Sequence, residues 1–263
     1  MQSLRIVRIG TCIAFGVAVL AARKWPRTTN AVVGLIAGTI GVGHGAADDA
    51  LLGARPSARL SKRAIGTVYG ISAVTVFLAA RRWPRLAKRS LFALSWFHFG
   101  AGDAAFAAAC GARETSRFAW VLRGGIPLAC TWPWVHRFTN LIATIVVLVA
   151  LRRGRVGDAL DLAVPTLAFA FAPGTATFGA YFALWHTPRH LALAVEQYAI
   201  GESLKERVAT FVRAALPNTL IALGAGAPLV AFAGEARREL FDGIILAVTV
   251  PHVVAVAVLE AGA

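Results

Sequence analysis

Two histidines lie four positions apart in an almost wholly apolar stretch, "ALWHTPRHLAL" at residues 183–193. On one helix, His186 and His190 would project from the same face, a spacing that suits two ligands of one metal ion. A neutral imidazole in an apolar interior requires a partner, and a metal ion supplies one to several rings at once. Pro188 indicates a kink or a helix start, which would change the direction in which the two histidine side chains point. Taken alone, the pair is more typical of structural hydrogen bonding than of a metal site.

More ionisable residues fall inside other apolar segments, although each costs at least roughly 2.5–3.5 kcal/mol at a bilayer centre. At about 1.5 Å per residue from the start of each segment, five histidines lie about 11 to 23 Å deep. They are His98, His186, His252, His44 and His190. All five fall on segments that run in the same direction, so they could share one middle layer of the bilayer. This convergence favours a metal site over scattered structural histidines, with four ligands: His44, His98, His186 and His190.

Acidic residues accompany two of these histidines. Asp48 follows His44 by four positions and therefore shares its helix face, where it could orient a ligand imidazole or accept a hydrogen bond from a neighbouring one. Asp103 follows His98 by five positions, which is a looser match to the same role. The alternative is that these acids pair with Arg189 or with helix termini.

The composition places this layer in a membrane protein. The 263 residues are 57% hydrophobic and 15% charged, against about 45–50% and about 25% in soluble domains. The net charge of +14 comes from basic residues that lie between apolar segments, as in "ARKWPR" and "ARRWPRLAKR". Basic loops of this kind are typical of membrane proteins, where Lys and Arg meet anionic lipid head groups. The positive charge therefore indicates a membrane surface, and no nucleic-acid partner is expected.

Ten apolar segments follow one another, and seven to ten of them are predicted to be transmembrane helices. They are residues 6–22, 31–52, 65–80, 91–112, 120–134, 138–151, 159–172, 175–196, 216–233 and 240–259. No linker divides them. The prediction is an all-α, polytopic membrane helix bundle that forms a single integral membrane domain, residues 1–263. Residues 196–213 are amphipathic, which suits an interfacial helix or the solvent-exposed start of the next transmembrane helix.

One heptapeptide recurs, as "AARKWPR" at 21–27 and "AARRWPR" at 79–85. Each copy precedes an apolar segment that carries a histidine, His44 in the first and His98 in the second. Parallel repeats are a common plan in membrane proteins, and chance similarity in an Ala- and Arg-rich chain is the alternative.

Several reaction classes lack their motifs in this sequence. The chain has no HExxH of zinc peptidases, no GxSxG nucleophile elbow, no P-loop and no dinucleotide-binding fingerprint. Imidazole ligands suit zinc, copper, iron and nickel alike, so the ligand type does not select the metal. The reaction class that remains is redox or oxygen chemistry on an apolar substrate.

Five motifs in order resemble the Brp/Blh family of bacterial and archaeal membrane β-carotene 15,15′-dioxygenases. They are "GHGAADD" with His44 and Asp48, "SWFHFGAGD" with His98 and Asp103, "RGGIPLACTWPWVH" at 123–136, "YFALWHTPRH" with His186, Arg189 and His190, and "TVPHVV" with His252. The resemblance covers most of the chain. The sequence departs from it after the HFG triplet, where the family often has an acidic residue and this chain has Ala101 and Gly102.

The resemblance implies a multi-pass enzyme of the inner (plasma) membrane. Iron(II) would be its cofactor, held by His44, His98, His186 and His190. The enzyme would add O₂ across the central double bond of β-carotene and release two molecules of all-trans-retinal for a microbial rhodopsin. Asp48, Asp103 and His252 would surround the site, and His252 could be an alternative ligand.

Two other functions stay open. A transporter or channel could move protons or metal ions through the His/Asp layer, although its ionisable groups would usually be spread along the depth. Another membrane metalloenzyme, acting on lipid, would use the same ligands.

Overall fold

The structure is a computed structural model and describes most of the chain. The described residues are 2–41, 43, 45–46, 48, 62–112, 117–129, 132–172, 174–197, 200–232 and 237–261. His44 lies outside them. All regular secondary structure in these ranges is helical, which confirms the predicted all-α class.

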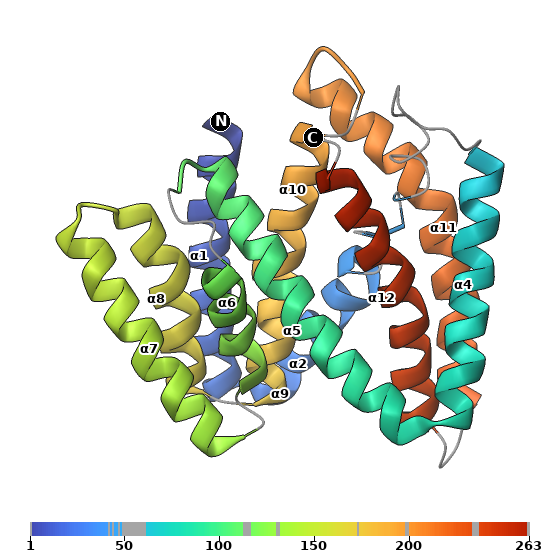
Figure 1. Cartoon of the computed structure of the whole chain (residues 1–263), viewed down its shortest axis with the longest axis horizontal. Coiled ribbons are helices and arrows are strands. Elements are labelled where there is room, and N and C mark those ends of the chain that lie inside the picture. The colour runs from blue at the N-terminus through green and yellow to red at the C-terminus, as the bar shows by residue number, and fades with distance from the viewer. Residues whose placement is uncertain are drawn as a thin grey trace. The chain divides into compact units, whose positions relative to one another are not determined.

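The helices follow the apolar segments of the sequence closely (Figure 1). The α-helices are α1 Gln2–Lys24, α2 Pro26–Ile36, α4 Lys62–Arg82, α5 Pro84–Ala109, α6 Arg117–Ala129, α7 Pro133–Arg152, α8 Val156–Phe171, α9 Thr175–Tyr181, α10 Thr187–Gln197, α11 Leu204–Phe232 and α12 Arg237–Ala261. Two π-helices occur as well, η1 Ala37–Gly41 and η2 Phe182–His186. The amphipathic stretch after α10 leads into α11, which begins at Leu204, so it is the polar start of a long helix.

The chain forms two compact units, and each consists of two stretches of sequence. Unit 1 comprises Met1–Gly41 and Ser95–Ala194, and unit 2 comprises Val42–Leu94 and Val195–Ala263. The single-domain interpretation stays a prediction.

In unit 1, α7 packs against α6 and α8, and α1 packs against α2, α8, α9 and η2 (Figure 1). Helices α5 and α6 cross at two glycines, Gly100 and Gly124. A Cβ atom on Gly100 would overlap the carbonyl oxygen of Trp120, and one on Gly124 would overlap that of Trp96. Only glycine permits this approach of two backbones. The contact fixes α5, and therefore His98, against α6.

In unit 2, α12 packs against α4 and α11. Ala80 of α4, Ala87 of the first turns of α5 and Leu246 of α12 form a buried cluster. The small alanine side chains allow the helices to approach closely, as in other membrane helix pairs.

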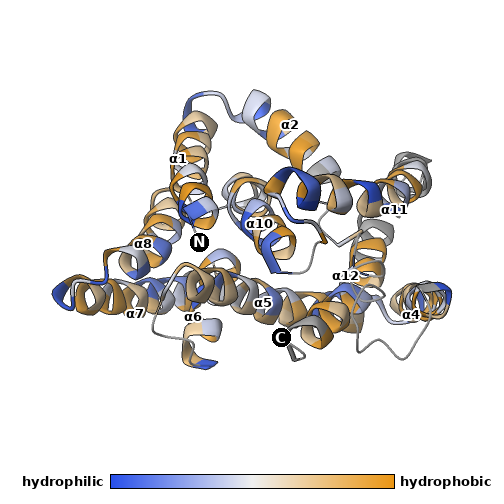
Figure 2. Ribbon diagram, turned by 90° about the horizontal axis from the view of Figure 1, so that it is seen from above, coloured by the Kyte–Doolittle hydropathy of each residue, from blue (hydrophilic) through white to orange (hydrophobic). Residues whose placement is uncertain are grey.

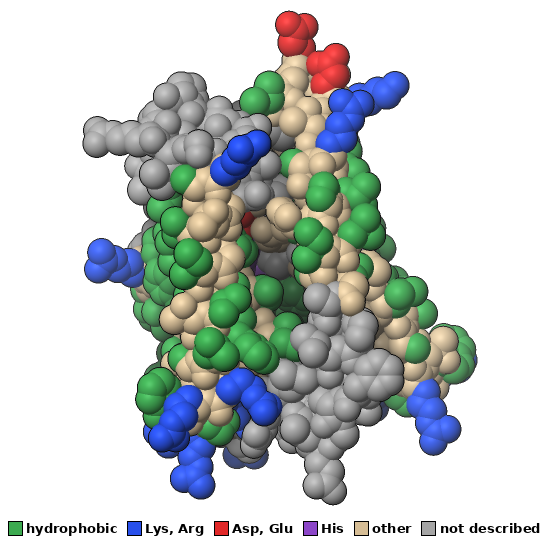
Figure 3. Space-filling view, turned by 90° about the vertical axis from the view of Figure 1, so that its right-hand side faces the viewer, with side chains coloured by type: hydrophobic (Ala, Val, Ile, Leu, Met, Phe, Trp, Pro, Cys, Tyr) green, Lys and Arg blue, Asp and Glu red, His purple; other side chains and the backbone are tan. Residues whose placement is uncertain are grey.

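Three helices in the described part of the chain are long and apolar enough to cross a membrane, Gln2–Lys24, Arg63–Arg82 and Trp134–Arg152. Large apolar side chains are exposed along α1, at Ile6, Ile9, Ile13, Val17 and Leu20. Figure 2 shows hydrophobic residues along most of α7 and hydrophilic residues at its end. Figure 3 shows the side where α4 lies, with hydrophobic side chains along the helices and Lys and Arg side chains at their ends. This distribution suits association with a bilayer.

The repeated heptapeptide forms the same corner twice. Each tryptophan ends one helix by donating its backbone N–H, Trp25 to Ala21 at 2.7 Å and Trp83 to Ala79 at 2.9 Å. The next helix begins at the following proline, because proline at the first helical position needs no hydrogen-bond acceptor. The two sequence copies therefore have equivalent local structures.

Candidate metal centre

Three of the four predicted ligands, His98, His186 and His190, lie together in unit 1. The Nε2 atoms of His98 and His186 are 3.4 Å apart. The ring centroids are separated by 5.1 Å for His98–His186, 5.8 Å for His98–His190 and 5.9 Å for His186–His190. All three side chains are buried. The structure thus brings together residues from two distant parts of the sequence.

The spacing of the two Nε2 atoms fits two ligands of one ion. Nitrogens that each lie ~2.1 Å from a divalent ion, at a tetrahedral angle, are ~3.4 Å apart. The observed 3.4 Å matches this value and is long for an ordinary hydrogen bond. Among the described residues, which exclude His44, no three His, Cys, Asp or Glu side chains have the spacing of a complete metal site.

The π-helix η2 sets the direction of His186. The backbone N–H of Thr187 bonds to the carbonyl of Phe182, five residues back, which defines the wide turn. Pro188 has no N–H and cannot bond to the carbonyl of Leu184, so a regular α-helix is interrupted at this point. Short π-helical turns are frequent at functional sites. Pro188 therefore explains the widened turn, which ends at His186.

The other π-helix, η1, contacts η2 in unit 1. A Cβ atom on Gly41, the last residue of η1, would lie 2.5 Å from Cε1 of Phe182. Glycine is therefore required for the two π-helices to pack at this distance.

Asp103 lies behind His186, on the side away from His98. Its Oδ1 is 3.6 Å from Nδ1 of His186, which is too long for a hydrogen bond but close enough to favour a proton on Nδ1. Its Oδ2 accepts hydrogen bonds from Tyr181 Oη and Trp185 Nε1, both at 2.9 Å. In metal sites, a histidine usually binds the metal through one ring nitrogen and contacts a carboxylate through the other. Asp103 has this position relative to His186.

Gly102 leaves room for two of the imidazoles. A Cβ atom at this position would lie 3.0 Å from Cε1 of His186 and 3.8 Å from Nδ1 of His190. Gly102, one of the two residues at which this chain departs from the family pattern, therefore touches the candidate site directly.

A buried ion-pair network holds the helix that carries the histidine pair. Arg189 Nη1 is 3.0 Å from Asp161 Oδ1, and Arg8 Nη2 is 2.8 Å from Asp161 Oδ2. Arg189 also donates from Nε to Thr11 at 2.9 Å, and its guanidinium lies 3.4 Å from the ring centroid of Trp185. Arg189 thus pairs with Asp161 of α8.

Phenylalanine rings surround His186. The Phe99 ring packs edge-on at a centroid distance of 4.7 Å, and the Phe182 ring stacks at 6.4 Å with an interplanar angle of 19°. These contacts limit rotation of the imidazole and keep its surroundings apolar.

His252 and Asp48 form a second buried pair, within unit 2. Nδ1 of His252 is 2.7 Å from Oδ2 of Asp48. Gly45 lies against the same ring, and Asn218 donates to the carbonyl of Ala46 at 2.8 Å. Helices α11 and α12 therefore contact the described residues Gly45, Ala46 and Asp48.

Sequence reasoning missed three charged residues in the interior of unit 1: Arg8, Asp161 and Arg123. Asp161 and Arg123 fall inside predicted apolar segments, so the rule that selected the histidines could have found them. Arg8 also lies in such a segment. Tyr181 and Trp185 lie four residues apart in the sequence, a spacing that places both polar atoms on one helix face and could have identified them.

The comparisons with known proteins agree with the resemblance seen in the sequence. A family model described as Beta-carotene 15,15'-dioxygenase matches residues 131–260. The match includes His186, His190 and His252 but not His98. No curated protein and no solved structure matches the chain. Residues 131–260 are therefore similar to the β-carotene 15,15′-dioxygenase family, in agreement with the ordered motifs of the sequence.

Proposed function

We propose that the protein is an iron(II)-dependent dioxygenase of the plasma membrane that cleaves the central 15,15′ double bond of β-carotene. The products would be two molecules of all-trans-retinal, which would serve a microbial rhodopsin. The family match supports carotenoid cleavage in general. The observation that carries the proposal is the 3.4 Å spacing of the His98 and His186 Nε2 atoms inside an apolar, buried part of unit 1.

His44, His98, His186 and His190 would hold the iron, which supplies a position where O₂ is activated next to the polyene. Four neutral imidazoles leave the charge of the site equal to that of the ion. Asp103 lies on the Nδ1 side of His186, so the Nε2 lone pair would be available to the ion. The apolar rings of Phe99 and Phe182 exclude water and fix the orientation of an apolar substrate.

Expression in β-carotene-producing bacteria tests the reaction directly. The cells are expected to lose β-carotene and to accumulate retinal, measured by chromatography and mass spectrometry. With ¹⁸O₂, both retinal products are expected to carry label. Apocarotenals of unequal length would show cleavage at another bond. Unchanged carotenoid at normal membrane expression would contradict the proposal and would favour a transport function.

Substitution of single histidines tests the ligands. His98→Ala and His186→Ala are expected to abolish retinal formation and to lower the iron content of the purified protein from about one per chain. His136→Ala is the matched control, because His136 bonds to Asn140 on α7, apart from this cluster. Full activity in either ligand variant would contradict the assignment.

A further inference from the structure

Arg123 is a buried cation in unit 1 that the candidate metal centre does not use. Its side chain is 5% exposed, and its Nε and Nη1 atoms have no hydrogen-bond partner among the described residues. It lines a cavity of about 20 Å³ between α6, α7 and α8. A buried charge without a partner is strongly unfavourable, so this guanidinium requires a ligand.

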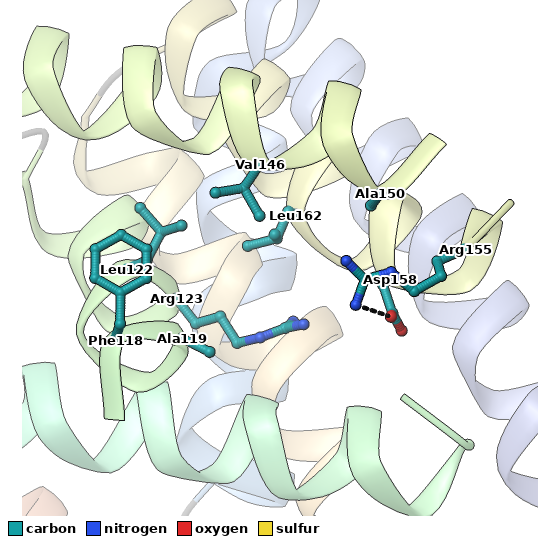
Figure 4. Close-up of a pocket in the computed structure, with 9 residues that line it drawn as sticks. All are labelled: Phe118, Ala119, Leu122, Arg123, Val146, Ala150, Arg155, Asp158 and Leu162. Carbon is teal, nitrogen blue, oxygen red and sulfur yellow. Dashed lines mark ion pairs between the residues drawn. The ribbon is translucent and has the colours of Figure 1, made fainter. Parts of the chain in front are cut away.

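The opposite wall of the cavity carries a second arginine. Figure 4 shows the Arg123 guanidinium pointing across the cavity toward Arg155 and Asp158. The Arg155 Nη1 to Asp158 Oδ2 distance is 3.8 Å, near the limit for an ion pair. Two cations and one anion line the cavity, which leaves a surplus of positive charge facing its interior.

The cavity lies near the end of a helix long enough to cross a membrane. Its lining residues Val146 and Ala150 precede the end of α7, Arg152, by six and two positions, or about 9 and 3 Å. Arg152 and Arg153 follow and are exposed. This depth is where phospholipid head groups meet the hydrocarbon, and basic pockets between transmembrane helices bind such head groups.

We propose that this cavity is a binding site for the phosphate group of an anionic phospholipid. A cavity of this size has room for about one water molecule, and therefore for one phosphate oxygen. That oxygen accepts hydrogen bonds from Arg123, and the rest of the head group stays at the mouth beside Arg155. Guanidinium and phosphate form strong charge-assisted hydrogen bonds.

The apolar part of the lining distinguishes a lipid from free phosphate. Phe118, Leu122 and Val146 line the cavity beside the arginines, and Phe118 is 53% exposed. An acyl chain would cover this surface, whereas inorganic phosphate would leave it bare. A single water would bond to Arg123 without neutralising the surplus charge.

Lipid titration of the purified full chain tests the site, independently of carotenoid cleavage. In phosphatidylcholine nanodiscs, added phosphatidylglycerol is expected to bind and to raise the unfolding temperature, while inorganic phosphate does neither. Arg123→Gln is expected to weaken phosphatidylglycerol binding about tenfold or more, because hydrogen bonds to charged groups are the stronger class. The exposed Arg152→Gln is the matched control. Equal binding by Arg123→Gln and the unmodified protein, or an equal effect of inorganic phosphate, would overturn the proposal.

A second variant covers the case in which Arg123→Gln does not fold. Asp158→Asn removes the one acid of the cavity without removing a hydrogen-bonding side chain. It is expected to strengthen phosphatidylglycerol binding, measured as retained lipid by native mass spectrometry. Unchanged or weaker retention would contradict an anionic ligand at this position.

Discussion

Asp103 and His186 face each other from different helices of unit 1, with Oδ1 and Nδ1 separated by 3.6 Å. The other nitrogen of the same imidazole is turned toward His98. The second carboxylate oxygen is held by Tyr181 and Trp185. One buried carboxylate therefore favours a proton on Nδ1 of His186, while Nε2 is turned toward His98.

Replacement of Asp103 should weaken the metal site without removing a ligand. In Asp103→Asn the negative charge behind His186 is lost, although an amide oxygen can still accept the Tyr181 and Trp185 hydrogen bonds. Residues of this kind typically contribute 10–100-fold to metal affinity. Iron titration of the purified variant is expected to show a loss in this range, with a parallel loss of retinal formation in cells.

Tyr181→Phe is a control for which a smaller effect on iron affinity is expected. It removes one of the two donors to Asp103 and leaves the carboxylate charge in place, so a smaller loss of iron affinity is expected. Equal iron affinity in Asp103→Asn and the unmodified protein would show that Asp103 does not orient His186.

Gly102 should not tolerate a side chain. In Gly102→Ala the new Cβ atom would lie 3.0 Å from Cε1 of His186, so the imidazole must move by a few tenths of an ångström. Because metal ligands need accurate placement, iron occupancy and retinal formation are expected to fall while the protein remains folded. The measurement is iron per chain in protein whose circular dichroism is unchanged.

Gly16→Ala is the matched control, because a Cβ atom there meets nothing within 4 Å. Alanine has a higher helix propensity than glycine, so this variant should retain its fold and its iron. A similar iron loss in both variants would exclude a specific role for the space at Gly102.

Helix positions could be predicted because the apolar segments are long and are separated by charged or turn-forming residues. The Trp-Pro corners illustrate this, since proline restricts where the next helix begins. The spacing of His186 and His190 likewise placed both residues on one buried helical stretch. These properties depend on neighbours in the sequence, so the sequence alone reveals them.

The partners of the buried groups could not be predicted in the same way. Asp161 pairs with Arg8 and Arg189, which are separated from it by long stretches of chain. Such pairs depend on how helices pack, and apolar periodicity does not specify packing partners. The π-helix at Phe182–His186 was also not predicted, although Pro188 marked the position where the α-helix is interrupted.

Asp161 should be a strong determinant of stability. It is 2% exposed and forms ion pairs with both Arg8 and Arg189. Removing one partner of a buried ion pair typically costs about 3–5 kcal/mol, because the remaining charge is left without compensation. Asp161→Ala is expected to lower the thermal unfolding temperature and the yield of folded protein substantially. Asp158→Ala, whose ion pair is longer and more exposed, should have a smaller effect, and equal losses in the two variants would contradict this assignment.

The polar start of α11 carries a reciprocal hydrogen-bonded cap. The Glu206 carboxylate accepts hydrogen bonds from the backbone N–H groups of Glu202 at 2.9 Å and Ser203 at 3.1 Å, and the Ser203 hydroxyl accepts from the Glu206 N–H at 3.2 Å. This arrangement satisfies donors that a helix start otherwise leaves without partners. The two backbone donors hold the pKa of Glu206 below its usual value.

A lowered pKa fixes the direction of the pH dependence. The stabilising effect of the Glu206 carboxylate is fully present above its unfolded-state pKa of about 4.3 and is lost as the pH falls through the lower folded-state pKa. The unfolding temperature of Glu206→Gln should therefore differ from that of the unmodified protein most at pH 7, and the difference should shrink below pH 4 to 5. Ser203→Ala removes a hydroxyl that does not titrate and contributes least to the lowered pKa of Glu206, so its difference should depend on pH less than that of Glu206→Gln. A Glu206→Gln difference that did not change with pH would show that the carboxylate charge does not stabilise the start of α11.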